Sequence, residues 1–131
     1  MVRMELARVI INEQSQSQVI FLREVNGSRM FPIVIGIFEA AAIDQKLRNI
    51  ENPRPLTHDL IRNILNGLDV GLERIVVTDL KNNTFLAKLV ISQNGTEVEI
   101  DARPSDSIAL AITMNSPIYV NERVLDKVKN V

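Results

Sequence analysis

The chain has 131 residues, of which 46% are hydrophobic and 24% are charged, and its formal net charge is −1. These values are typical of one globular domain with a substantial core, so we expect residues 1–131 to form a single domain. The absence of cysteine excludes disulfides and thiolate sites, and the near-neutral charge argues against non-specific nucleic-acid binding, which usually needs a basic excess.

The beginning of the chain does not resemble a signal peptide. Met1–Ile11 carries Arg3, Glu5 and Arg8, so it lacks the apolar stretch that such a peptide needs. The longest apolar run, 30–38, is too short to cross a bilayer. We therefore predict a cytoplasmic protein that does not contact membranes.

The first half of the chain is predicted to form three strands and a helix. Alternating apolar residues indicate strands over 6–12, 18–25 and 29–36. Asn26-Gly27 predicts a hairpin turn before the third strand, because both residues tolerate positive φ. A run of small and aliphatic residues then predicts a helix over about 38–48.

A further helix is expected after this half, over about 58–68. Thr57 is a suitable N-cap, and Asp59 in the first turn complements the helix dipole. Pro53 and Pro55 favour an extended approach to this helix, because residues before proline avoid the α region.

The second half shows the same order of elements as the first. Strands are predicted over 72–78, 84–92 and 97–102, with a turn at Asn94-Gly95 before the third, and a helix over about 105–114. A short strand over 117–120 and a helix over about 122–129 close the chain.

The similarity of the two halves indicates an internal duplication. The Asn-Gly turn falls at the same place in both, and Leu6–Ile11 aligns with Leu72–Val77. We predict an α+β fold in which two duplicated βββα units form a mixed or antiparallel sheet packed with helices.

A polar stretch follows the last strand of the second unit. In a strand Asp101 and Arg103 share one face, and Asp106 in the first helical turn comes back toward Arg103. One interpretation is a local salt bridge with helix capping by Ser105. The other is a phosphate or cation site, in which Asp101 and Asp106 hold Mg²⁺ or Mn²⁺ and Arg103 binds phosphate.

The stretch 53–59 contains the only histidine of the chain. It is interpreted either as a stiff loop leading into a capped helix, with His58 on the helix surface, or as part of a site. In the second interpretation His58 is a general acid or base, because histidine exchanges protons near neutral pH. One histidine without cysteine argues against structural zinc.

Glu39 is the third candidate, at the start of the first unit's helix. The equivalent position in the second unit is the turn 104–107. Glu39 either complements the helix dipole, or the two equivalent turns converge in one cleft.

Three motifs together resemble a known family. They are Phe31-Pro32-Ile33-Val34-Ile35-Gly36 followed by Glu39-Ala40, then Pro53-Arg54-Pro55-Leu56-Thr57-His58-Asp59, then Ile100-Asp101-Ala102-Arg103-Pro104-Ser105-Asp106-Ser107-Ile108-Ala109-Leu110-Ala111. In this order they resemble the bifunctional nuclease domain, formerly catalogued as a domain of unknown function, over nearly the whole chain. The resemblance implies an α+β fold and a nuclease activity on RNA and DNA, which is attributed to plant members.

The first functional hypothesis is a metal-assisted nuclease that hydrolyses phosphodiester bonds of RNA or DNA with Mg²⁺ or Mn²⁺. The expected catalytic residues are Glu39, His58, Asp59, Asp101 and Asp106, and the expected substrate-binding residues are Arg54, Thr57, Arg103 and Ser105. The few aromatic residues, 4% of the chain, argue against a base-stacking platform.

The second hypothesis is a non-catalytic ligand-binding or protein-interaction module that forms a homo-oligomer. Ile20, Leu86 and Val90 are expected on strand faces opposite the core. This arrangement favours a sheet covered on both faces or a buried homodimer contact.

Overall fold

The computed structural model describes residues 1–12 and 14–129. These residues form an α+β fold with a seven-stranded mixed sheet and four helices. In chain order the elements are β1 (Val2–Ile10), β2 (Ser17–Glu24), β3 (Met30–Gly36), α1 (Ile37–Leu47), α2 (Thr57–Gly67), β4 (Gly71–Lys81), β5 (Thr84–Gln93), β6 (Thr96–Ala102), α3 (Pro104–Met114), β7 (Ile118–Val120) and α4 (Glu122–Val128). The predicted fold class and the predicted order of elements are confirmed.

The strand order is β3-β2-β1-β7-β4-β5-β6. Neighbouring strands are antiparallel except β4 and β7, which are parallel. Each half of the chain therefore forms a three-stranded meander, and β7 joins the two meanders. The last strand of each meander, β3 or β6, lies at a sheet edge and leads directly into a helix, α1 or α3. The duplication itself stays a prediction.

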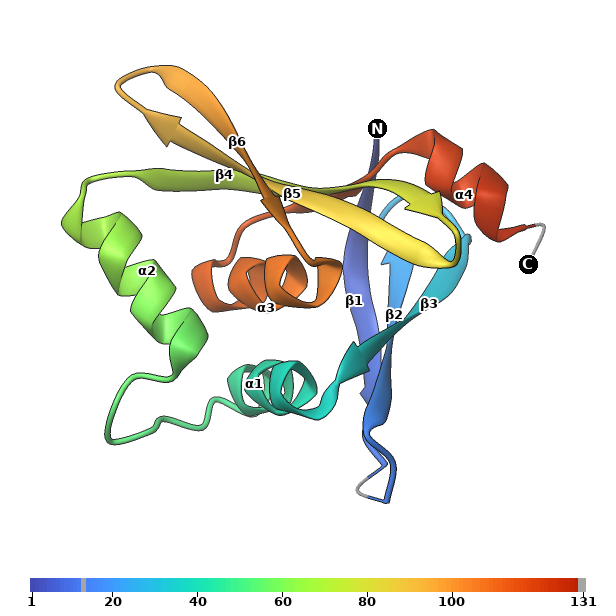
Figure 1. Cartoon of the computed structure of the whole chain (residues 1–131), viewed down its shortest axis with the longest axis horizontal. Coiled ribbons are helices and arrows are strands. Elements are labelled where there is room, and N and C mark those ends of the chain that lie inside the picture. Colours follow the sequence, from blue (N-terminus) through green and yellow to red (C-terminus); the bar gives the residue numbers. More distant parts are fainter. Residues whose placement is uncertain (13, 130–131) are drawn as a thin grey trace.

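Figure 1 shows that the two halves of the sheet run in different directions, and that α1 and α3 lie in the corner between them. The central helix is α3, which packs on α1, α2, β4 and β5. Its segment Ile108–Ala111 is at most 2% exposed. A helix that is apolar on most sides is expected to be buried. Because α3 is buried and packs on α1, the first turns of these two helices are held close together.

Only one of the two Asn-Gly pairs forms the expected tight turn. Asn94 and Gly95 have φ of 52° and 79°, as a two-residue type I′ hairpin requires. Between β2 and β3 the connection is a longer loop, and Gly27 has no positive φ. A Cβ on Gly27 would meet the flexible carboxylate of Glu24, which would have to move aside.

Two of the three side chains expected opposite the core are already buried within one copy of the chain. Ile20 belongs to the main core cluster, so its predicted orientation is wrong, and Val90 is also fully buried. Leu86 is 38% exposed. Ile20 and Val90 are therefore covered within one copy of the chain, and of the three only Leu86 is exposed enough to take part in the homodimer contact, one of the two arrangements expected.

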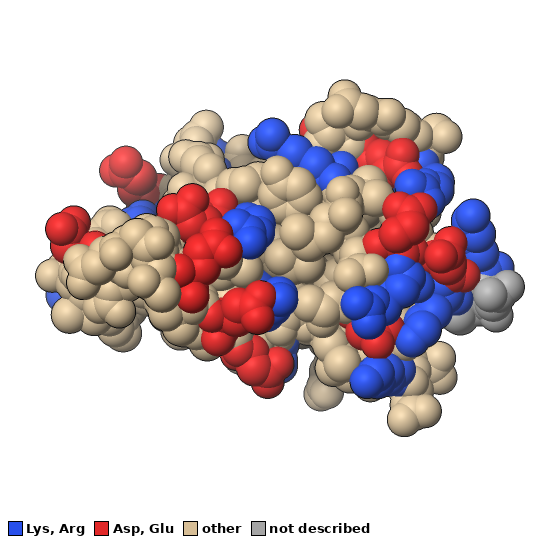
Figure 2. Space-filling model, turned by 90° about the horizontal axis from the view of Figure 1, so that it is seen from above, with Lys and Arg blue, Asp and Glu red and all other residues tan. Residues whose placement is uncertain are grey.

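On the outer face of β4–β6, acidic and basic side chains are interspersed (Figure 2). Arg74 pairs with Glu97, and Lys88 pairs with Glu99. The described side chains of this face therefore form no broad basic surface. Separately, no helix among the described residues is long and apolar enough to cross a membrane.

Candidate functional site

A cleft of about 730 Å³ lies where three helices begin. Its walls come from one face of α1 between Phe38 and Gln45, from residues 55–58 at the start of α2, and from Arg103 and Asp106 at the start of α3. The predicted convergence of the two strand-to-helix turns is therefore present in the structure.

Each of these helices carries an acidic residue at its third position, where a carboxylate complements the positive end of the helix dipole. The residues are Glu39 in α1, Asp59 in α2 and Asp106 in α3. Gly36 precedes α1 and leaves space for Glu39, because a Cβ there would lie 2.8 Å from Glu39 Oε2. Two of these three carboxylates, Glu39 and Asp106, line the cleft.

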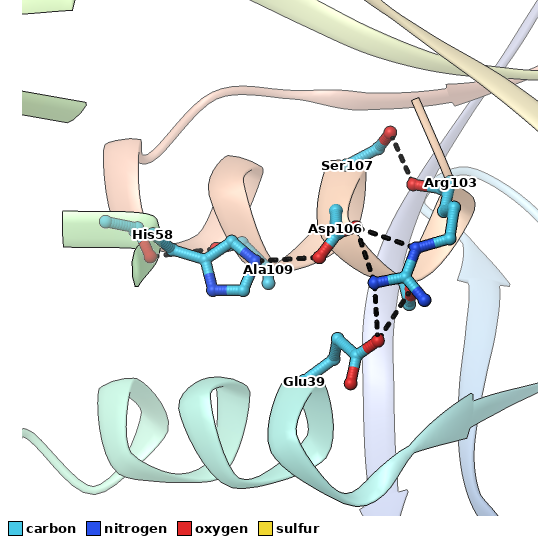
Figure 3. Close-up of polar contacts among 8 residues, drawn as sticks. Glu39, His58, Arg103, Asp106, Ser107 and Ala109 are labelled. Carbon is cyan, nitrogen blue, oxygen red and sulfur yellow. Dashed lines mark hydrogen bonds and ion pairs between the residues drawn. The ribbon is translucent and has the colours of Figure 1, made fainter. Parts of the chain in front are cut away.

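Four side chains in the cleft form a continuous polar chain, which we call the acid–base network: Glu39, His58, Arg103 and Asp106. His58 Nε2 lies 3.1 Å from Asp106 Oδ1. Arg103 Nη2 lies 2.8 Å from Asp106 Oδ2 and 2.9 Å from Glu39 Oε1. Figure 3 shows Arg103 between the two carboxylates, with His58 on the far side of Asp106.

The acid–base network is buried at one end and open at the other. The whole residues His58 and Glu39 are each 8% exposed, whereas the side chain of Arg103 is 69% exposed. The interpretation of His58 as a helix-surface residue is therefore wrong. Asp106, and after it Glu39, raises the pKa of Arg103 above its usual value. The guanidinium is thus a permanent positive charge at the mouth of the cleft.

The hydrogen bond to Asp106 also fixes the tautomer of His58. An ionised carboxylate only accepts hydrogen bonds, so we assign the proton of the neutral ring to Nε2. Nδ1 has no hydrogen-bond partner among the described residues, so its lone pair can accept a proton. A histidine held by a carboxylate beside an arginine provides proton transfer and anion binding in one place.

Sequence reasoning did not select Ser107, which positions Arg103. The backbone N–H and the hydroxyl of Ser107 both donate to the Arg103 carbonyl, each at 2.9 Å. Ser107 is completely buried. The sequence signal is the spacing of four residues between Arg103, which precedes the helix, and Ser107. At this spacing a serine hydroxyl reaches back to the backbone carbonyl.

Asp59 does not point into this cleft. Its Oδ1 lies 2.7 Å from Lys46 Nζ and 3.5 Å from Arg62 Nη1, and its Oδ2 accepts a hydrogen bond from the backbone N–H of Leu56 at 3.1 Å. The hydrogen bond from Lys46 lowers the pKa of Asp59. We call Lys46, Asp59 and Arg62 the α2 brace, because they hold the start of α2 against α1.

Asp101 and Asp106 are not brought together. Asp101 lies on the exposed edge strand β6 and lines a second cleft of about 580 Å³. Asp106 lines the first cleft and is occupied by His58 and Arg103. Among the described residues, no group of three or more His, Cys, Asp or Glu side chains is placed to hold a metal ion.

The three remaining candidates differ in position. Thr57 lines the cleft and is the first residue of α2. The N-cap is Leu56, whose backbone is still extended, and not Thr57 as expected. Ser105 is buried, donates weakly to Glu39 Oε1 at 3.4 Å, and does not cap α3, whose N-cap is Arg103. Arg54 is exposed in the loop before α2 and does not line the cleft.

Residues 20–131 match the model of the bifunctional nuclease domain. An uncharacterized protein of Mycobacterium tuberculosis is 48% identical over 114 residues, which cover 86% of this chain and 68% of that protein.

Plant relatives are more distant. Bifunctional nuclease 1 of Oryza sativa subsp. indica is 25% identical over 118 residues, covering 87% of this chain and 36% of that protein. Bifunctional nuclease 2 of Arabidopsis thaliana is 23% identical over 114 residues, covering 85% and 35%. The chain spans only about a third of these nucleases, but the match over residues 20–131 covers most of its own length, and it therefore belongs to the bifunctional nuclease domain family.

Proposed function

We propose that the protein is a nuclease that cleaves phosphodiester bonds of RNA or DNA in the cleft between α1, α2 and α3. The observation that carries the proposal is the chain His58–Asp106–Arg103, in which one carboxylate joins a proton-transfer group to a phosphate-binding group. The family match and the plant nucleases support the same class of reaction.

Arg103 is suited to bind the phosphate. Its Nε and Nη2 contact Asp106 and Glu39, whereas Nη1 has no partner among the described residues. The free N–H groups can therefore bind a non-bridging phosphate oxygen, while Asp106, which contacts both Nε and Nη2, keeps the guanidinium in place. In the transition state the same charge stabilises the negative charge that develops on those oxygens.

His58 is suited to move the proton. The attacking oxygen, from water or from the ribose 2′-hydroxyl of RNA, transfers its proton to Nδ1 and forms the new P–O bond. The P–O bond to the leaving nucleoside oxygen breaks, and that oxygen takes a proton from the imidazolium or from solvent. Asp106 stabilises the positive charge on the ring between these two events.

Participation of Mg²⁺ or Mn²⁺ stays a prediction. The carboxylates of this cleft fit such an ion poorly, because Asp106 and Glu39 are both engaged with Arg103, and Asp101 lines the other cleft. We therefore assign no step to a metal ion.

The test incubates the purified protein with single-stranded RNA and DNA of one sequence, in Mg²⁺, Mn²⁺ or EDTA. We expect cleavage that His58→Ala lowers by about 10²- to 10⁴-fold, the usual contribution of a general acid or base. Arg23→Ala is the control, because Arg23 pairs with Glu5 on β1, away from this cleft. Thermal unfolding of each variant verifies that it is folded.

Two results would contradict the proposal. One is the absence of cleavage in all three ionic conditions, and the other is an unchanged rate for folded His58→Ala. Oligonucleotide binding without cleavage would favour the alternative, a non-catalytic ligand-binding module. RNA products that end in a 2′,3′-cyclic phosphate would identify the 2′-hydroxyl as the nucleophile. Homo-oligomer formation and a cytoplasmic location also stay predictions.

A further inference from the structure

The side chain of Phe38 is unusually exposed at the rim of the cleft. It is 85% exposed, more than any other large hydrophobic residue among those described. Burying such a side chain normally stabilises a protein. Single exposed hydrophobic residues are common and need no explanation by themselves, but Phe38 lies in a cleft whose other residues give its exposure a meaning.

Phe38 begins an apolar stripe along α1 that lines the cleft. Ala41, Ala42 and Gln45 follow it at the spacings that place residues on one helix face. Pro55 and Leu56 form further apolar wall. One end of the cleft therefore presents apolar surface beside an exposed ring, and the other end carries the acid–base network.

The other three phenylalanine rings already make aromatic or cation–π contacts within the protein. Phe31 packs against Phe85 with ring centroids 5.6 Å apart, and the guanidinium of Arg8 lies 5.1 Å from the Phe21 ring. Phe38 has no such ring contact among the described residues. Phe38 lines the same cleft as Glu39 and Arg103, so a ligand bound in this cleft can reach both the ring and the guanidinium.

A ligand that matches both ends needs a flat apolar ring next to an anion, as in a nucleotide. We propose that Phe38 stacks on an unpaired base whose neighbouring phosphate binds Arg103, so that the cleft selects single-stranded nucleic acid. In a duplex the bases are stacked on each other and cannot reach the ring without being extruded. This inference rests on the proposed function and specifies its substrate.

The test measures binding of a labelled single-stranded oligonucleotide by fluorescence anisotropy, in the His58→Ala background so that the oligonucleotide stays intact. We expect Phe38→Ala to weaken binding by about 5- to 150-fold, the equivalent of 1–3 kcal/mol for one stacked base. Phe38→Tyr should bind as the parent does. Phe38→Leu should bind weakly, because leucine keeps the apolar area but not the planar face.

Two controls isolate the ring and the base. Leu68→Ala removes a side chain that is 66% exposed and does not line the cleft, and it should not change binding. An oligonucleotide of the same length without bases should bind the parent weakly and should bind Phe38→Ala equally weakly. Binding of a duplex should not respond to Phe38→Ala.

Several results would overturn the inference. The first is unchanged binding by Phe38→Ala, and the second is parent-like binding by Phe38→Leu. The third is a molar mass of Phe38→Ala in solution that differs from that of the parent, which would mean that Phe38 contacts a second copy of the chain. Because binding is measured without cleavage, the two proposals fail separately. Cleavage that His58→Ala abolishes, with no effect of Phe38→Ala on binding, would leave only the nuclease proposal standing.

Discussion

Asp59 and Asp106 occupy the same position in neighbouring helices, yet they belong to different parts of the molecule. Each is the third residue of its helix and lies near the positive end of the helix dipole. Asp59 accepts a hydrogen bond from the N-cap backbone of its own helix, whereas Asp106 binds a histidine and an arginine side chain. Position in a helix therefore does not determine the role of a carboxylate.

The residue that precedes each helix explains the difference. The N-cap of α3 is Arg103, whose side chain folds back onto Asp106. The N-cap of α2 is Leu56, which offers only its backbone N–H, so the countercharge for Asp59 comes from Lys46 of α1. One carboxylate consequently keeps an exposed arginine in the cleft, and the other fastens two helices together.

The comparison predicts that substitutions in the acid–base network change the cleavage rate and that substitutions in the α2 brace change stability. After His58→Ala, the largest effect is expected for Arg103→Ala. It removes the charge that faces the phosphate, and losing one such group from an active site typically lowers the rate by about 10²- to 10³-fold, or ~2.7–4 kcal/mol. Arg103→Lys should recover only part of this loss, because lysine lacks the planar fork.

Cleavage of single-stranded RNA under single-turnover conditions measures this effect, with Arg23→Ala as the matched control. A folded Arg103→Ala variant that cleaves at the parental rate would show that the phosphate binds elsewhere. The acid–base network would then not differ from the α2 brace in its effect on the cleavage rate.

The helices were more predictable from sequence than the strand ends. The helix over 37–47 was expected over 38–48, and that over 104–114 over 105–114, because apolar spacing and helix-start residues are local signals. The first strand was expected to begin at Leu6 but begins at Val2. The extra residues pair with Ile118–Val120, a contact between distant segments that no local pattern encodes.

The candidate site was predictable as a region but not in its side-chain directions. The motifs around His58 and Asp106 do meet, at 3.1 Å. Asp59 follows His58 directly, but successive helical residues point about 100° apart, so the two face different neighbours. Asp101 lies on the edge strand β6 and lines the second cleft, which does not include Asp106.

Asp59→Asn is expected to have an intermediate effect, on stability and not on chemistry. At pH 7 it should lower the free energy of unfolding by about 1–2 kcal/mol, because Lys46 loses its charged partner in a buried setting. Lys46 lowers the pKa of Asp59 in the folded state. The stabilisation is therefore present above the usual aspartate range, near pH 4, and is lost as the pH falls through the lowered pKa.

Urea unfolding of both proteins between pH 7 and pH 2.5 measures this effect. The difference in unfolding free energy should shrink on acidification, because the protonated aspartic acid resembles asparagine in charge. A constant difference over this range would mean that the ion pair with Lys46 contributes no stability. The cleavage rate of Asp59→Asn, measured well below its unfolding temperature, should stay close to that of the parent.

The smallest effect is expected for Glu39→Gln, which tests where the network ends. Glu39 shares Arg103 with Asp106, and its negative charge repels an incoming phosphate. Removing that charge should lower the KM for RNA by about two- to fivefold at low salt, and the change should diminish at 0.15 M salt as screening increases. The kcat should change less, because Asp106 still holds both Arg103 and His58. Glu5→Gln, an exposed carboxylate on β1, is the control and should alter neither constant. A rise in KM would instead mean that Glu39 orients Arg103 for binding, and it would make both helix-start carboxylates equal partners of the arginine.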